Sequence, residues 1–95
     1  MINGKVADFI DQLYYGQELL FLYKGKKFFI QGWFNKEGDE AVMALEEVSE
    51  APFSGYIWEI RSKKMRECAE AFLAAPIWDG LNFRQIEKEV EWTDW

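Results

Sequence analysis

The sequence predicts an α+β fold: a four-stranded antiparallel sheet with an N-terminal helix and two C-terminal helices, in the order α-β-β-β-β-α-α. Three observations lead to this prediction. The chain begins with an amphipathic segment, continues with apolar runs that flank a glycine-containing turn, and ends with segments that carry helix-capping residues. A chain of 95 residues is the size of one domain, so we expect residues 1–95 to share a single core.

The first helix is expected over residues 4–15. Asn3 is of a type that caps a helix N-terminus, and Gly16 suits the position just after a helix C-terminus. Apolar residues between them recur with the three- and four-residue spacing of one buried helix face. They are Val6, Phe9, Ile10 and Leu13.

Four strands are expected to follow. Residues 18–23 and 27–34 are apolar and aromatic runs on either side of the turn 24–26, which predicts a β-hairpin. Residues 41–48 form the third expected strand, and residues 56–60, rich in β-formers, form the fourth. The nearly continuous apolar character of the hairpin predicts that both sheet faces are at least partly covered.

Two helices are expected in the last third of the chain. Ser62 is expected to cap a helix over residues 63–75. Asn82 and Gln85 have the spacing of a capping box and predict a short third helix. The tail, residues 91–95, is expected either to pair as an edge strand or to remain loose.

The residue types argue against most catalytic chemistry. The chain has no histidine and one cysteine, Cys68, so zinc and a histidine-activated nucleophile are both excluded. Cys68 lies on the inner stripe of the second expected helix, where we expect it to be inert packing. No catalytic residue, metal site or cofactor is predicted. Glu18 and Glu59 are the carboxylates to examine, because a strand carboxylate facing an apolar layer could serve acid–base chemistry.

Charge and segment lengths point to an intracellular protein-binding role. The net charge of −6 argues against a direct nucleic-acid binder and against anchoring to anionic lipid. The N-terminus acquires charges before an apolar secretion signal can develop, and the longest apolar run is too short to span a bilayer. We therefore expect a cytoplasmic protein, monomeric or homodimeric through exposed strand edges, with a protein partner that has a basic surface.

Acidic and aromatic residues are the candidate partner-binding groups. Residues 37–50 carry acids and no base, and the tail combines acids with tryptophans, which are enriched at interface hot spots. Trp33 and Trp58 lie in expected strands and are expected in the core. A cluster of cations at the start of the second helix opposes the helix dipole and is either a solvated turn or a functional surface. The predicted binding residues are Glu37, Asp39, Glu40, Glu46, Glu47, Glu50, Trp92, Asp94 and Trp95.

Several sequence blocks resemble a group of small uncharacterised bacterial proteins. They are residues 14–18 (YYGQE), 23–33 (YKGKKFFIQGW), 75–80 (APIWDG) and 89–92 (EVEW), under half of the chain. This resemblance implies no activity. In size, acidity and lack of catalytic side chains, the chain is also similar to the immunity proteins of bacterial polymorphic toxin systems, including contact-dependent inhibition.

Together these observations favour a non-catalytic inhibitor, an immunity protein that neutralises a cognate toxin through acidic and aromatic surface. A close alternative is a phage-type nuclease inhibitor that mimics nucleic acid with the same acids. An alternative of another class is a small-ligand or carboxylate-based enzymatic domain built around Glu18 or Glu59.

Overall fold

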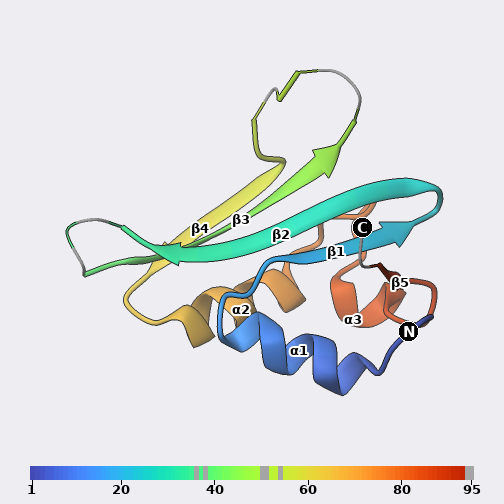
Figure 1. Cartoon of the computed structure of the whole chain (residues 1–95), viewed down its shortest axis with the longest axis horizontal. Helices are drawn as coiled ribbons and strands as arrows, with labels where there is room; N and C mark the ends of the chain where they lie inside the picture. Colours follow the sequence, from blue (N-terminus) through green and yellow to red (C-terminus); the bar gives the residue numbers. More distant parts are fainter. Residues whose placement is uncertain (36, 38, 50–51, 54, 94–95) are drawn as a thin grey trace.

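A computed structural model describes residues 1–35, 37, 39–49, 52–53 and 55–93 of the chain. Within these residues the fold is α+β, with three helices and an antiparallel sheet of five strands in the order β4-β3-β2-β1-β5 (Figure 1). The elements, in chain order, are α1 (Val6–Tyr14), β1 (Leu19–Tyr23), β2 (Lys26–Phe34), β3 (Ala41–Val48), β4 (Trp58–Ser62), α2 (Met65–Ala74), α3 (Phe83–Ile86) and β5 (Glu91–Thr93). No helix among the described residues is long and apolar enough to cross a membrane.

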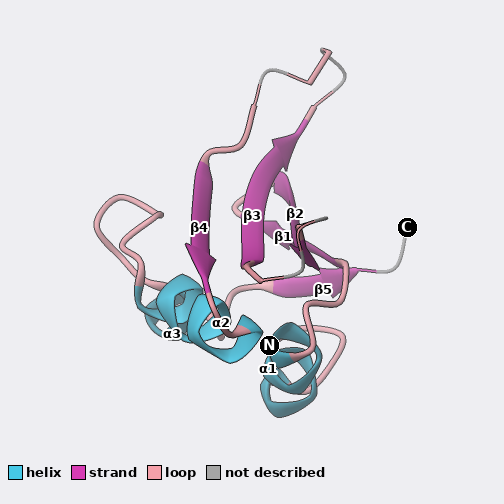
Figure 2. Ribbon diagram, turned by 90° about the vertical axis from the view of Figure 1, so that its left-hand side faces the viewer, coloured by secondary structure: helices cyan, strands magenta, loops and turns pink. Residues whose placement is uncertain are grey.

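The helices lie together on one face of the sheet, and the core fills the space between (Figure 2). Alternate residues of each strand point into this layer, as in β1, where Leu19, Phe21 and Tyr23 are buried and the residues between them are half-buried. Phe83 stacks on Phe9 with ring centroids 5.3 Å apart, and it also contacts Phe72 at 5.6 Å. Aromatic contacts therefore join α1, α2 and α3 through a shared core.

The other face of the sheet is not covered by any helix of the described residues. Val42 and Ala44 point to this face and are nonetheless buried. The ring of Trp33, on the same face, lies 6.2 Å from that of Tyr56, which in turn contacts Phe53 at 5.2 Å. Trp33 is thus half-buried outside the main core, whereas Trp58 packs against the core as expected, 5.6 Å from Phe72.

Several expected termini are confirmed. Gly16 follows α1 with a φ of +72°, and its N–H donates to the Leu13 carbonyl while the Gln17 N–H donates to the Gln12 carbonyl. This is the Schellman arrangement for which glycine is favoured. The capping box of α3 is present: the Gln85 N–H donates to the Asn82 side chain at 3.0 Å, and the Asn82 N–H donates to the Gln85 side chain at 2.9 Å.

The expected number of strands was wrong by one, because part of the tail pairs as β5. Phe21 lies opposite Trp92 in this pairing, and the N-terminus also takes part. The Ile2 N–H donates to the Val90 carbonyl, and the Trp92 N–H donates to the Ile2 carbonyl. This bonding explains why Asn3 does not cap α1: it adopts a φ of +64°, and the helix begins two residues later than predicted.

The predicted cap at Ser62 was also wrong. Ser62 is the last residue of β4, paired with Ala41, and its hydroxyl donates to the carboxylate of Glu67. Sheet pairing keeps Ser62 extended, so α2 begins at Met65, with Lys64 at the N-cap position. The fourth strand is correspondingly shifted two residues along the chain from its predicted bounds.

At Gly32, strand β2 closely approaches the backbone that follows α1 and the side chain of Met65, the first residue of α2. The Gly32 N–H donates to the Gly16 carbonyl, and a Cβ on Gly32 would lie 2.7 Å from the Met65 sulfur and 2.9 Å from the Gly16 Cα. Because one of these neighbours is backbone, the crowding cannot be relieved by a side-chain rotation alone.

We predict that Gly32→Ala lowers the free energy of unfolding by about 1–3 kcal/mol, the usual range for overpacking. Denaturant unfolding of the purified variant measures this. Gln31→Ala, a change on the opposite sheet face, is the matched control and should alter stability by no more than about 0.5 kcal/mol. Equal effects of the two substitutions would contradict the close approach seen here.

Candidate functional site

Two tight turns face each other at one end of the molecule. Lys24 and Gly25 both have positive φ angles, 51° and 78°, and connect β1 to β2. Asp79 and Gly80, with φ angles of 52° and 84°, connect Trp78 to Leu81, whose backbone groups exchange hydrogen bonds of 3.1 and 2.9 Å. Both are two-residue hairpin turns of the type that needs two positive φ angles, which explains the glycine in each.

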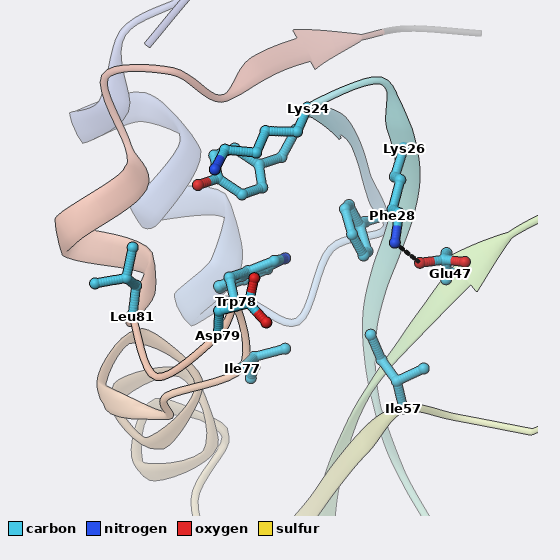
Figure 3. A pocket seen from close by; sticks show the side chains of 10 residues that line it. Lys24, Lys26, Phe28, Glu47, Ile57, Ile77, Trp78, Asp79 and Leu81 are labelled. Carbon is cyan, nitrogen blue, oxygen red and sulfur yellow. Dashed lines mark ion pairs between the residues drawn. The ribbon is translucent and has the colours of Figure 1, made fainter.

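A cleft of about 230 Å³ lies between these turns and the end of β3 (Figure 3). We call it the hairpin cleft. Six of its lining side chains are apolar or aromatic, and four are charged. The lining residues are Tyr23, Lys24, Lys26, Phe28, Glu47, Ile57, Ile77, Trp78, Asp79 and Leu81.

Trp78 joins the hairpin cleft to the core. Only 8% of this residue is exposed, and its rings lie about 6 Å from those of Phe28, Phe72 and Tyr23. Its indole nitrogen, on the side of the ring toward Phe28 in Figure 3, is buried without a hydrogen-bond partner among the described residues. Trp78 therefore fixes the 77–81 turn against the core, and its aromatic body forms the wall of the cleft.

The rim of the hairpin cleft combines charges of both signs with exposed apolar groups. The Lys26 ammonium lies 3.8 Å from the Glu47 carboxylate, and the Lys24 ammonium lies over the Tyr23 ring. Ile57 and Leu81 are 51% and 39% exposed, which is high for residues of their type at the edge of a core. The cleft thus has aromatic and aliphatic walls, is open to solvent, and carries charged side chains among its lining.

This composition suits one apolar side chain of a partner better than a cofactor. Pockets for drug-sized ligands usually measure roughly 300–1,000 Å³ and surround most of the ligand, so the hairpin cleft is smaller than that class. Among the described residues, no group of three or more Cys, Asp or Glu side chains is placed to hold a metal ion. The hot-spot residues of protein interfaces, in contrast, occupy small, well-packed pockets surrounded by contacts that exclude water.

The predicted acidic residues fall into two groups at opposite ends of β3. Glu37, Asp39 and Glu40 lie at the turn before β3, and Glu46 and Glu47 lie near its end. The separation along the strand is about 20 Å at 3.3 Å per residue. Glu46 and Glu47 are adjacent and point to opposite faces of the sheet, with only Glu47 at the hairpin cleft. Glu50, a further predicted member, lies outside the described residues.

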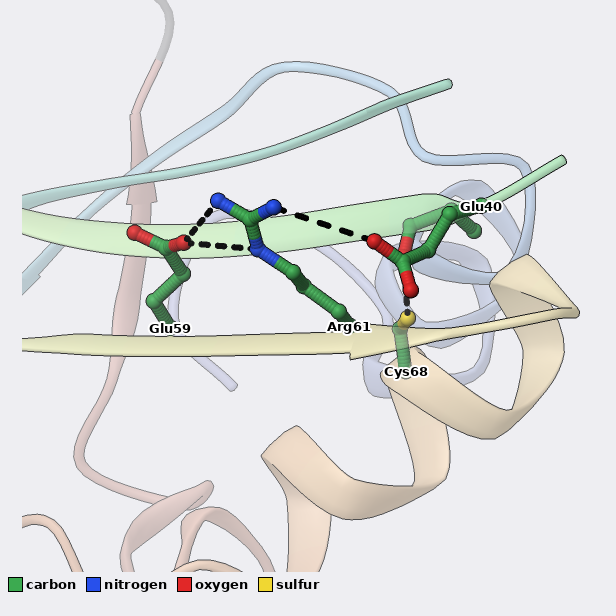
Figure 4. A network of polar contacts seen from close by, with 5 residues as sticks. Glu40, Glu59, Arg61 and Cys68 are labelled. Carbon is green, nitrogen blue, oxygen red and sulfur yellow. Dashed lines mark hydrogen bonds and ion pairs between the residues drawn. The ribbon is translucent and has the colours of Figure 1, made fainter. Parts of the chain in front are cut away.

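Nearby cations compensate part of this acidic charge. Arg61 bridges the Glu40 and Glu59 carboxylates at 3.7 and 3.3 Å (Figure 4). In α2, the Arg66 guanidinium pairs with Glu70 at 3.2 Å and lies 5.0 Å from the Tyr14 ring centroid. The cation cluster noted in the sequence is therefore spread over β4 and α2 and has acidic or aromatic neighbours at its arginines.

One residue of the aromatic patch predicted in the tail, Trp92, packs against the core. Trp92 is half-buried in β5, 5.3 Å from the Phe9 ring and directly over Gly4. It lines a second hollow, of about 410 Å³, together with Glu18 and several polar groups. The other predicted members, Asp94 and Trp95, lie outside the described residues.

The carboxylates considered for catalysis face solvent. Glu59 is exposed on the uncovered face of the sheet, where it pairs with Arg61. Glu18 is exposed at the rim of the second hollow, whose other lining includes Asn3 and Gln12. Both carboxylates are exposed, so neither is buried in an apolar layer, which was the arrangement that carboxylate chemistry required.

Comparison of the chain with models of protein families, with curated proteins and with solved structures finds no match.

Sequence reasoning did not identify the hairpin cleft, although it singled out the segments that build it. The blocks 23–33 and 75–80, noted for their resemblance to other small proteins, supply most of the lining. They are separated by more than forty residues in sequence, and only the fold brings them together. The available signal was the pair of turns, Lys24-Gly25 and Asp79-Gly80, each next to an aromatic residue.

Cys68 is buried in α2, and its thiol donates to the Ala41 carbonyl at 3.6 Å. The pKa of the Cys68 thiol is raised above its ordinary value, mainly by burial and to a smaller extent by the nearby carboxylate of Glu67. The thiolate is the reactive form, so both burial and the raised pKa suppress reactivity.

We predict that iodoacetamide alkylates Cys68 more than about tenfold more slowly in the folded protein than in denaturant at the same mildly alkaline pH. Because the folded-state pKa is raised, the protonated thiol contributes stability that is present below the ordinary thiol pKa. That contribution is lost as the pH rises through the raised value. Mass spectrometry follows the alkylation, and equal rates in both states would show that the thiol is accessible.

Proposed function

We propose that the protein is a non-catalytic inhibitor of the immunity-protein class, which binds and neutralises a cognate bacterial toxin in the cytoplasm. The observation that carries the proposal is the hairpin cleft, a hollow of one-side-chain size with aromatic and aliphatic walls and charged side chains at its rim. In this proposal an aromatic or aliphatic side chain of the toxin enters the cleft and packs against Trp78, Ile57 and Leu81. A small number of such anchors supply most of the affinity in protein interfaces.

Electrostatic attraction supports the encounter between the two proteins. The net charge of −6 accelerates the approach of a basic partner, and such long-range attraction weakens as salt screens it. Glu47 is the predicted acidic residue at the rim of the cleft, so it links the steering charge to the anchor site.

The nucleic-acid mimic is less well supported by the arrangement of the acids. Such a mimic needs carboxylates in a row that replaces phosphates, whereas the described acids of residues 37–49 lie at the two ends of β3. Pairing of Glu40 with Arg61 and of Glu47 with Lys26 reduces their charge further. A carboxylate enzyme is also less well supported, because Glu18 and Glu59 are exposed.

The anchor is tested by Ile57→Asp, which places a charge in the hairpin cleft at a position that is half exposed. The wild-type protein is used to capture its partner from the native lysate, and the dissociation constant of the purified pair is then measured by calorimetry. We expect the variant to bind at least about 30-fold more weakly, the effect of losing a hot spot of about 2 kcal/mol.

Phe34→Asp is the matched control, because Phe34 is 59% exposed at the far end of β2 and does not line the cleft. It should bind as the wild type does, and both variants should retain the wild-type melting temperature within a few degrees. Equal binding by the two variants would exclude the cleft as the interface. A captured partner that does not arrest growth when expressed alone, or that still does so beside this protein, would contradict the immunity function.

The contribution of charge is tested by Glu47→Lys and Glu46→Lys, which make the same change at neighbouring positions on opposite sheet faces. We expect Glu47→Lys to reduce the association rate several-fold at low salt and to flatten its salt dependence, whereas Glu46→Lys has a smaller effect. Stopped-flow association over a salt series measures both rates. A larger effect of Glu46→Lys on the association rate would indicate that the partner binds the uncovered face of the sheet.

A further inference from the structure

Strand β4 forms an open edge of the sheet. It ends the strand order on one side, and Figure 2 shows no helix or strand of the described residues beyond it. The opposite edge is different, because Ile2 bonds to the backbone of Val90 and Trp92 and so covers β5. An uncovered edge strand presents N–H and C=O groups that can pair with another strand.

The hydrogen-bond pattern identifies which groups of β4 point outward. The Asn35 N–H donates to the Glu40 carbonyl at 3.0 Å, in the register of the β2–β3 pair. Because the direction alternates along a strand, Met43 then bonds toward β4, where its partner is Ile60. The neighbours of Ile60, which are Glu59 and Arg61, therefore direct both of their backbone groups away from β3.

The side chains of β4 are complementary to those of a second, antiparallel copy. A two-fold axis at Ile60 places Glu59 of one copy opposite Arg61 of the other, and the reverse pair forms by symmetry. In this register Glu59 and Arg61 are also the residues whose outward backbone groups would exchange hydrogen bonds. Charge and backbone pairing thus require the same alignment, and opposite charges across a strand pair are stabilising.

Apolar side chains of the core are also partly exposed to solvent at this edge. Trp58 and Ile60 point to the helix-covered face and contact the core, yet both are only half-buried. In the alignment about Ile60, the two Ile60 side chains form a directly opposed pair without mutual hydrogen bonds, in which side chains approach most closely. A second copy would therefore cover apolar surface that one chain leaves exposed.

We propose that two copies of this chain associate through β4, antiparallel and centred on Ile60, to form one sheet that is continuous across the dimer. The interface is isologous, with the same strand contributed by each copy. It lies at the opposite edge of the sheet from β5, and the proposal is independent of any toxin partner.

Charge reversal tests the register as well as the association. Glu59→Arg or Arg61→Glu alone places like charges opposite each other twice per dimer, and we expect the dimer dissociation constant to rise about tenfold or more. The double exchange Glu59→Arg/Arg61→Glu should restore the wild-type value. Mixing the two single variants should also give a heterodimer, because one variant then presents two cations at these positions and the other presents two anions. Sedimentation velocity over a concentration series measures every sample.

Glu89→Arg makes the same charge change near the opposite edge and should leave dimerisation unchanged. A second readout follows the backbone: the amides of Glu59 and Arg61 should become protected from hydrogen exchange as the wild-type protein is concentrated. A wild type that stays monomeric up to millimolar concentration would overturn the proposal. Two other results would also overturn it: a dimer whose dissociation constant is unchanged by the single charge reversals, or a double exchange that does not restore the wild-type dissociation constant.

Discussion

The structure depends on the burial of a cluster of aromatic rings between the helices and one face of the sheet. Phe83 lies at its centre, stacked on Phe9 and in contact with Phe21 and Phe72. A short helix such as α3 is not stable by itself, so its position rests on this packing and on its capping box. The cluster therefore holds α1, α2 and α3 in one layer and aligns the sheet beneath them.

Placing all of these helices on one face has consequences for the remaining surface. The opposite face carries the Trp33 ring, in contact with that of Tyr56, and strand β4 keeps an uncovered edge. At the edge of the aromatic cluster, one side of Trp78 packs against Phe72 in the core and the other side lines the hairpin cleft. The candidate binding surfaces are thus the places where the packing of the core ends.

Helix-capping residues were predicted correctly where their hydrogen-bond partners lie within a few residues in the sequence. Gly16 and the Asn82–Gln85 pair were predicted correctly because their hydrogen bonds are made within a few residues. Asn3 and Ser62 carry equally favourable cap side chains, yet both predictions were wrong. In each case a distant strand competes for the backbone: β5 for the N-terminal segment and β3 for Ser62. Long-range pairing overrode the local preference.

The sequence by itself determined the α+β class, most of the strands and helices, and the scarcity of catalytic side chains, because periodicity and residue type report on local geometry and chemistry. The tertiary structure alone decided that the acids of residues 37–49 separate along β3, that Trp92 packs on Phe9, and that blocks 23–33 and 75–80 meet in one cleft. These outcomes depend on strand register and on which face the helices cover. Both are set by contacts between residues far apart in the chain, which local patterns do not encode.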